Sequence, residues 1–154
     1  MFYYFASPYF CNKDQAFDFT CVSMPDYNIA LSEYLQIELN YIQIIITIMV
    51  MNKVNPLKNI PIFIKKIENY KKIKINNDPK KLSDFEDIFR KSLRTEIWTH
   101  LCIGKNSQVE INFGYDMCVY IASKTQIPIG NLKCPLSIVE VSKEFWLNLT
   151  DYQN

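Results

Sequence analysis

Residues 109–121 have the sequence VEINFGYDMCVYI, in which two alternating segments flank the turn Gly114-Tyr115-Asp116. On both sides of that turn the odd-numbered residues are apolar. Side chains alternate between the two faces of a strand, so each segment reads as a half-buried β-strand. Gly114 offers the left-handed backbone conformation that tight turns use. This stretch therefore predicts a β-hairpin.

Four further segments indicate strands around this hairpin. Phe2–Ala6 is short and aromatic, and Phe17–Val22 alternates with period two. The two are predicted to pair as an N-terminal hairpin with a long loop. Ser137–Val141 is predicted as the last strand, whereas 95–103 fits a helix or a strand, with alternation favouring the strand. Gly104-Lys105-Asn106 after it is a turn.

A long helix is predicted after the start signals Pro25, Asp26 and Asn28. The apolar residues that follow recur at spacings of three and four, which is the pattern of one helical face; they are Leu31, Leu35, Leu39, Ile42, Ile46 and Met49. The β-branched run 44–48 also fits a central strand. The continuous stripe favours the helix, which Asn55-Pro56 would follow.

Two more helices are predicted in the middle of the chain. One would start at Pro61, with proline in the first turn, and turn Phe63, Ile64, Ile67 and either Tyr70 or Lys71 inward. Residues 76–80 form a predicted loop.

The next helix would open with Ser83-Asp84-Phe85-Glu86, which has the spacing of a capping box. Its inward residues would be Phe85, Ile88, Phe89 and Leu93. The C-terminal aromatic segment Phe145, Trp146 and Leu149 fits one helical turn. Strands, then helices, then strands predict an α+β fold: an antiparallel or mixed sheet with two to three helices packed on one side. Length and the absence of a long linker predict one domain over residues 1–154.

Charge is unevenly distributed, although the formal net charge is only +1. The basic segment Lys53–Lys81 contains nine lysines and two acids, and the segments before and after it are acidic. Such asymmetry bears on partners rather than on the fold. Lysines with interleaved aromatics fit phosphate binding. With only two arginines, Arg90 and Arg94, base reading is disfavoured, so nucleic acid is not the leading partner.

Five cysteines without a C-x-x-C spacing indicate reduced thiols and a cytoplasmic protein. The N-terminus has no basic flank and so is not a typical secretory signal. The most apolar stretch, 42–51, is about half as long as a bilayer span requires. No membrane association is therefore expected.

Catalytic equipment is sparse in this sequence. His100 is the only histidine, and Cys102 would share its face on a strand, so a Cys–His dyad is the one enzymatic candidate. Metal binding would need three or four ligands, and no ligand spacing supports it. The chain is therefore expected to be no enzyme, with no metal and no cofactor.

The hairpin 109–121, followed by a strand with Glu140 and then aromatic residues, resembles a pattern in bacterial immunity proteins. These proteins neutralise the C-terminal toxin domains of contact-dependent growth inhibition and related polymorphic toxin systems. The stretch 18–35 has a similar character. The resemblance implies a small cytoplasmic binder that covers the active site or substrate groove of a cognate toxin domain, often a nuclease.

A basic nuclease groove would be met by acidic side chains. The candidate partner-binding residues are Asp18, Asp26, Tyr115, Asp116, Glu140 and Glu144. Two other hypotheses stay open: a nucleic-acid-binding accessory or regulatory protein that uses the basic segment Lys53–Lys81, and a phage-type inhibitor of a host enzyme. The sequence does not indicate an oligomeric state.

Overall fold

The computed structural model describes residues 1–8, 31–57, 60–68, 71–75, 79–94, 99–114 and 117–146, with the backbone alone for the segments within 60–80. The longer elements in these ranges are eight strands and two α-helices: β1 (Phe2–Ser7), α1 (Leu31–Met51), β2 (Ile60–Glu68), β3 (Lys71–Ile75), β4 (Pro79–Lys80), α2 (Leu82–Leu93), β5 (Thr99–Ile103), β6 (Val109–Phe113), β7 (Val119–Ser123) and β8 (Ser137–Val141). A short 3-10 helix (Ile129–Asn131) precedes β8, and one helical turn at 143–146 follows it. The predicted strand Phe17–Val22 lies outside the described residues. Its predicted pairing with β1 as an N-terminal hairpin is wrong, because β7 and β8 occupy the two edges of β1.

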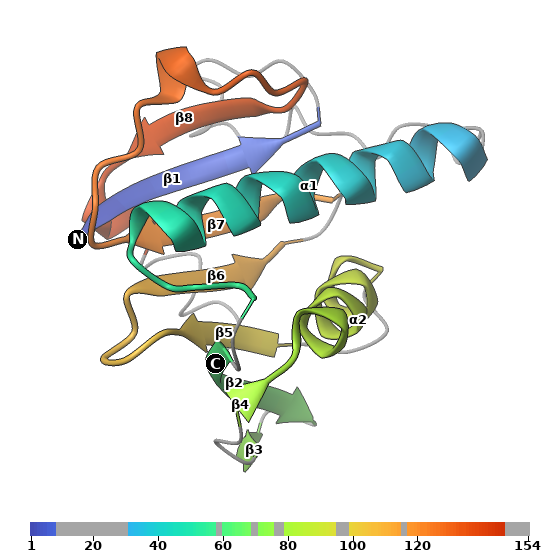
Figure 1. The fold of residues 1–154 in the computed structure, drawn as a ribbon, viewed down its shortest axis with the longest axis vertical. Helices are drawn as coiled ribbons and strands as arrows, with labels where there is room; N and C mark the ends of the chain where they lie inside the picture. The colour runs from blue at the N-terminus through green and yellow to red at the C-terminus, as the bar shows by residue number, and fades with distance from the viewer. Residues whose placement is uncertain are drawn as a thin grey trace.

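The strands form one sheet in the order β3-β2-β5-β6-β7-β1-β8, and β4 pairs separately with β2. All the strand pairs are antiparallel. Both helices cover the same face of this sheet, as Figure 1 shows. The α+β prediction, an antiparallel sheet with helices on one side, is therefore confirmed.

Helix α1 lies over the middle of the sheet and supplies much of the core. Tyr41, Ile45, Ile48 and Met49 are fully buried. These positions repeat at spacings of three and four, so they share one helical face. The helix prediction for this stretch is confirmed, and the alternative of a central strand at 44–48 is wrong. The predicted inward stripe is only partly right, because Leu35 and Leu39 are exposed and the buried face belongs to the second half of the helix.

By length and composition alone, Ser32–Met51 is apolar enough to cross a membrane. This apolar segment is thus longer than the stretch 42–51 on which the expectation of no membrane span was based. A buried core helix passes the same test, and the fully buried Tyr41 and Ile45 pack against the sheet. The finding therefore gives little support to a membrane span.

Helix α2 packs Phe85, Phe89 and Leu93 into the same core, as predicted. Its start differs from the predicted capping box. The N-cap is Lys81, and the Asp84 carboxylate accepts a hydrogen bond from the Lys81 backbone N–H at 3.2 Å. Ser83 therefore lies inside the helix and is not its N-cap. The carboxylate that bonds back to the N-cap is that of Asp84 rather than that of Glu86.

The predicted helix from Pro61 is wrong: the segment forms the hairpin β2–β3. Isoleucines at every second position of 60–64 and at 73 and 75 give a period of two. In the sheet, Ile62 lies opposite Ile103 and Ile64 opposite Leu101. The predicted loop 76–80 is also partly wrong, since Pro79–Lys80 pairs with β2 as β4.

The hairpin predicted at 109–121 is confirmed as β6–β7, with Phe113 opposite Val119. The role assigned to Gly114 is wrong, because the left-handed conformation belongs to Met117, whose φ is 60°. Glycine is needed at 114 for space instead. A Cβ there would lie 2.8 Å from Cε2 of Tyr120, closer than real contacts allow.

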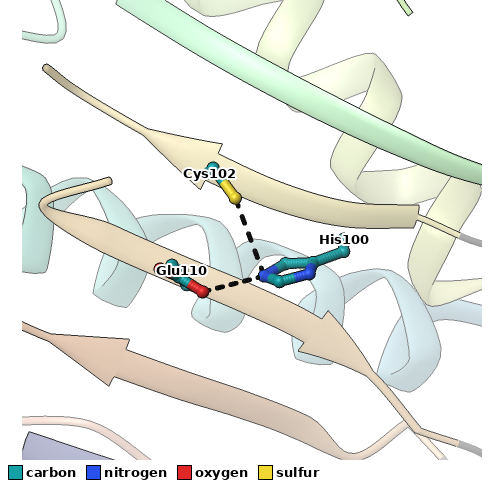
Figure 2. A group of neighbouring side chains, drawn as sticks. All are labelled: His100, Cys102 and Glu110. Carbon is teal, nitrogen blue, oxygen red and sulfur yellow. Dashed lines mark hydrogen bonds and ion pairs between the residues drawn. The ribbon is translucent and has the colours of Figure 1, made fainter. Parts of the chain in front are cut away.

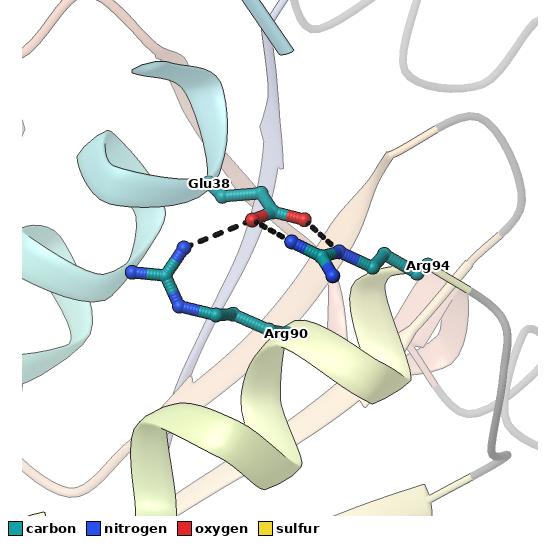
Figure 3. A network of polar contacts seen from close by, with 3 residues as sticks. All are labelled: Glu38, Arg90 and Arg94. Atoms are coloured by element: carbon teal, nitrogen blue, oxygen red, sulfur yellow. Dashed lines mark hydrogen bonds and ion pairs between the residues drawn. The ribbon is translucent and has the colours of Figure 1, made fainter. Parts of the chain in front are cut away.

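A buried ion pair joins the two helices (Figure 3). The Glu38 carboxylate of α1 is fully buried and accepts hydrogen bonds from Arg90 at 2.9 Å and from Arg94 at 2.5 and 2.8 Å. Burial alone would raise the pKa of Glu38, but the hydrogen bonds from Arg94 and Arg90 outweigh it and hold that pKa below its ordinary value. The two arginines of the chain thus have a structural role.

At the end of α1, Asn52 fastens the helix to the end of β7. Its Nδ2 donates to the Ile48 carbonyl and to Ser123 Oγ, both at 2.8 Å, and its Oδ1 accepts from the Thr125 N–H at 3.0 Å. Asn52 is buried, and Asn52→Ala removes these three hydrogen bonds, although the Ile48 carbonyl keeps the backbone N–H of residue 52 and Ser123 Oγ keeps the Thr125 carbonyl. We expect the free energy of unfolding to fall by about 2 kcal/mol in urea denaturation. Gln43→Ala, on the exposed side of the same helix, should change it by less than about 0.5 kcal/mol.

Candidate functional site

A cluster of three ionisable side chains lies on the face of the sheet that turns away from the helices. His100 and Cys102 are two residues apart on β5, so their side chains project from the same face. Glu110 on β6 lies directly opposite Cys102 in the antiparallel register. We call His100, Cys102 and Glu110 the His-Cys-Glu cluster.

The three side chains converge on one point, as Figure 2 shows. His100 Nε2 lies 3.1 Å from Glu110 Oε2 and 3.7 Å from Cys102 Sγ. The three donor atoms all lie within 4.8 Å of one another. The side chains of His100 and Glu110 are 17% and 22% exposed, and Cys102 is buried, so the cluster is largely shielded from water but not closed to it.

The electrostatics of the cluster favour the charged imidazole. Burial alone would lower the pKa of His100, but hydrogen bonds with Cys102 and Glu110, and the charge that these groups carry when ionised, raise it to about 9. At neutral pH the ring is therefore protonated and ion-paired with Glu110. A protonated ring cannot accept a proton, so in this state His100 is no general base.

The geometry also differs from that of a catalytic relay. In a nucleophile–histidine–carboxylate triad, the two ring nitrogens serve different partners. Here the same nitrogen, Nε2 of His100, faces both the thiol and the carboxylate. The predicted pairing of His100 with Cys102 on one face is therefore present, but its arrangement suits three donors around a common centre better than proton transfer along a chain.

Two buried hydrogen-bond donors without partners lie beside the cluster. Asn112 is opposite His100 in the register and is 3% exposed, and the ring of Trp146 lies 6.1 Å from the imidazole and is 6% exposed. Within the described part of the chain, neither Asn112 Nδ2 nor Trp146 Nε1 has a hydrogen-bond partner. A buried donor without a partner is costly, so each calls for an acceptor.

An apolar cluster covers the sheet next to this site. It is formed by residues of β1, β7 and β8, by Cys118 just before β7, and by the helical turn after β8: Phe5, Cys118, Tyr120, Ala122, Val141, Phe145 and Trp146. The predicted aromatic turn is present at 143–146, and Leu149 lies outside the described residues. Trp146 thus belongs to the apolar cluster and also packs against the His100 ring.

The lysine-rich hairpin β2–β3 borders the site on the other side. Lys65 is opposite His100 in the register, and Lys74 is opposite Lys65. These positions share one face of the sheet, because directly paired residues in antiparallel strands do so. The lysines of β2 and β3 therefore belong to a sheet edge.

Of the six predicted partner-binding residues, two are described. Glu140 is exposed on β8, and Glu144 is exposed in the turn that follows. Hydrogen bonds from its own backbone and from Ser142 lower the pKa of Glu144. Asp18, Asp26, Tyr115 and Asp116 lie outside the described residues.

Sequence reasoning missed Glu110, Asn112 and Trp146. The signal for Glu110 was available: two alternating segments, 99–103 and 109–113, are separated by a turn with Gly104 and Asn106. Pairing them as a hairpin brings Glu110 opposite Cys102. Nothing in the local sequence indicated that Trp146 would pack beside His100.

Comparison with known proteins gave no match to a protein-family model, to a curated protein or to a solved structure.

Proposed function

We propose that this chain acts by stoichiometric binding, as an immunity protein that docks on a cognate toxin domain in the cytoplasm and covers its active site or substrate groove. The toxin class that fits best is a nuclease, whose basic groove an acidic surface would complement. The hairpin β6–β7, on which the resemblance to immunity proteins rests, supports the proposal.

The observation that carries the proposal is the separation of charge along the sheet. The lysine-rich strands β2 and β3 form one edge, and β8 with Glu140 forms the other (Figure 1). Six strand spacings of about 4.8 Å separate β3 from β8, or about 29 Å. The screening length at physiological salt is about 8 Å, so the lysines do not cancel the carboxylates of the far edge.

Strand β8 also offers a backbone for recognition. Among the strands that the structure describes, β8 pairs only with β1. Val139 is half-buried and Glu140 is exposed. Such an edge accepts an added strand from a partner, with main-chain hydrogen bonds for affinity and charged side chains for specificity. Glu140 and Glu144 outnumber Lys143 along this edge, which favours a basic partner segment.

The direct test is co-expression with the toxin domain encoded immediately upstream of the gene. We expect the two proteins to co-purify in equal amounts and the cells to survive. A phage-type inhibitor of a host enzyme would have the same surface, and it would instead capture an enzyme of the host. If cells die and nothing co-purifies with the chain, the immunity proposal is wrong.

Charge reversal at the acidic edge gives a sharper test. We expect Glu140→Arg combined with Glu144→Arg to weaken toxin binding by about 10- to 100-fold, mainly through slower association, because like charges then meet. Lys72→Glu combined with Lys74→Glu, at the other edge, is the matched control and should change the dissociation constant by less than about 3-fold. Surface plasmon resonance at two salt concentrations would measure both.

The β2–β3 hairpin supports a second candidate, a nucleic-acid-binding accessory protein. Lys65 and Lys74 are directly opposite each other. Like charges directly opposite each other destabilise a sheet, and neutralisation by nucleic-acid phosphates would relieve that repulsion. Filter binding against salt distinguishes the two: affinity for DNA or RNA that falls steeply with salt, and that Lys72→Glu with Lys74→Glu abolishes, would favour this candidate. No affinity at low salt would exclude it.

A further inference from the structure

We infer that His100, Cys102 and Glu110 form a binding site for one Zn²⁺ ion, with three protein ligands and a fourth position for an acceptor ligand such as water. This inference does not depend on the proposed function. It starts from the convergence of Nε2, Sγ and Oε2 on one point, within 4.8 Å of one another.

The distances between the donor atoms fit tetrahedral zinc. With bond lengths of about 2.0–2.1 Å to nitrogen, about 2.3 Å to sulfur and about 2.1 Å to oxygen, tetrahedral ligands lie about 3.6 Å apart for nitrogen and sulfur and about 3.4 Å apart for nitrogen and oxygen. In the cluster these two distances are 3.7 Å and 3.1 Å. The third distance, between the sulfur and the carboxylate oxygen, is no more than 4.8 Å, and tetrahedral zinc needs about 3.6 Å. An ion can therefore enter when the Glu110 carboxylate rotates toward Cys102.

The donor chemistry selects the metal. Thiolate and imidazole donors bind Zn²⁺ in preference to Mg²⁺ or Ca²⁺, and a carboxylate is a regular third zinc ligand. On binding, the protons of the thiol and of Nε2 leave to solvent, because zinc takes the thiolate and the neutral imidazole. The backbone of β5 and β6 fixes the three positions through the register Cys102 opposite Glu110 and His100 opposite Asn112.

The second, independent observation is the pair of unpartnered donors beside the cluster. Asn112 Nδ2 and Trp146 Nε1 are buried next to His100, and each lacks an acceptor in the described part of the chain. A water, hydroxide or small anion in the fourth zinc position would be such an acceptor. The cluster supplies the cation ligands, and its surroundings supply donors for what the cation would hold.

Zinc and cobalt titrations of the purified full chain, freed of metal by a chelator, test the inference. We expect one Zn²⁺ per chain in competition with a chromophoric chelator. Co²⁺ should bind in the same place and give a thiolate-to-cobalt charge-transfer band in the near ultraviolet with visible bands of tetrahedral intensity. Cys102→Ala should abolish that band and weaken Zn²⁺ binding at least about 100-fold, because even second-shell changes cost 10- to 100-fold.

Two variants complete the design. Glu110→Gln keeps the side-chain shape and should weaken Zn²⁺ binding at least about 10-fold. Cys134→Ser, which removes a free thiol outside the cluster, is the matched control and should bind Zn²⁺ like the natural chain. Circular dichroism of each metal-free variant checks that the fold persists. Zn²⁺ binding that survives Cys102→Ala, or a Co²⁺ complex without the thiolate band, would overturn the inference.

Discussion

Phe89→Ala should lower the free energy of unfolding by about 3–5 kcal/mol, as large-to-small changes at fully buried aromatic residues do. Phe89 is completely buried where α2 meets the sheet. Its ring packs edge-on against Phe113 at 5.0 Å and lies within 5.8 Å of Phe85 and 6.4 Å of Tyr41. Alanine removes contacts to α1, α2 and β6 at once and leaves a cavity that rigid neighbours cannot fill.

Urea denaturation followed by tryptophan fluorescence would measure this loss, with Ile88→Ala as the matched control. Ile88 lies on the same helix and is only partly buried against the core, so its truncation should cost about half as much. Phe89→Leu retains much of the volume and should lose no more than about 1.5 kcal/mol, which gives a folded reference if the alanine variant does not fold. A loss below about 1 kcal/mol for Phe89→Ala would mean that α2 does not pack on the sheet as described.

The two faces of strand β6 serve the core and the His-Cys-Glu cluster separately. In β6, Ile111 and Phe113 face the helices, whereas Glu110 and Asn112 face the other side. Phe89 packs against Phe113, on the helix-covered face. We therefore regard stability and metal binding as two properties of one strand that different side chains control, since alternate residues point to opposite faces.

Periodicity predicted the elements whose two faces differ in polarity. The hairpin β6–β7 and helix α1 each carry a long apolar stripe with one period, so the strand and helix assignments followed directly. The segment 61–70 fits both periods, because Phe63, Ile64, Ile67 and Tyr70 are spaced like a helix while isoleucines at 60, 62 and 64 alternate. Pairing with β5 makes this segment a strand rather than a helix. That pairing joins residues far apart in the sequence, so the local pattern does not reveal it.

The His-Cys-Glu cluster was half predictable for a related reason. A strand puts His100 and Cys102 on one face, which local sequence reveals. Glu110 joins them only in the register that pairs it with Cys102, and the turn between β5 and β6 sets that register. A slip of one residue would send the Glu110 side chain to the helix-covered face. The site therefore depends on turn geometry as much as on its three ligands.

The buried ion pair between the helices yields the second large effect. Removing both arginines, Arg90→Ala with Arg94→Ala, strands the fully buried Glu38 carboxylate and should cost about 3–5 kcal/mol at pH 7. Glu38→Gln should cost less, because the Arg90 and Arg94 side chains are 30% and 37% exposed and water can solvate them once the carboxylate is gone. Arg94→Ala should lower the free energy of unfolding more than Arg90→Ala does, since Arg94 donates two of the three hydrogen bonds to Glu38.

The pH dependence fixes the cause of that loss. The folded-state pKa of Glu38 lies below its ordinary value, so ionised Glu38 binds its proton less readily in the folded chain than in the unfolded one. The stabilisation is complete above the unfolded pKa of about 4.3 and disappears as the pH falls through the lower folded pKa. Tyr34 beside it has its pKa raised, by burial and by the Glu38 charge, and so stays neutral throughout this range.

The difference in unfolding free energy between the natural chain and Glu38→Gln, measured by urea denaturation from pH 7 down to pH 3, should therefore stay constant to about pH 5 and then shrink. The double arginine variant should lose less of its stability on acidification, because protonation relieves its unpaired carboxylate. A difference that stays constant to pH 3 would show that packing of the glutamate side chain, and not its charge, holds α1 to α2.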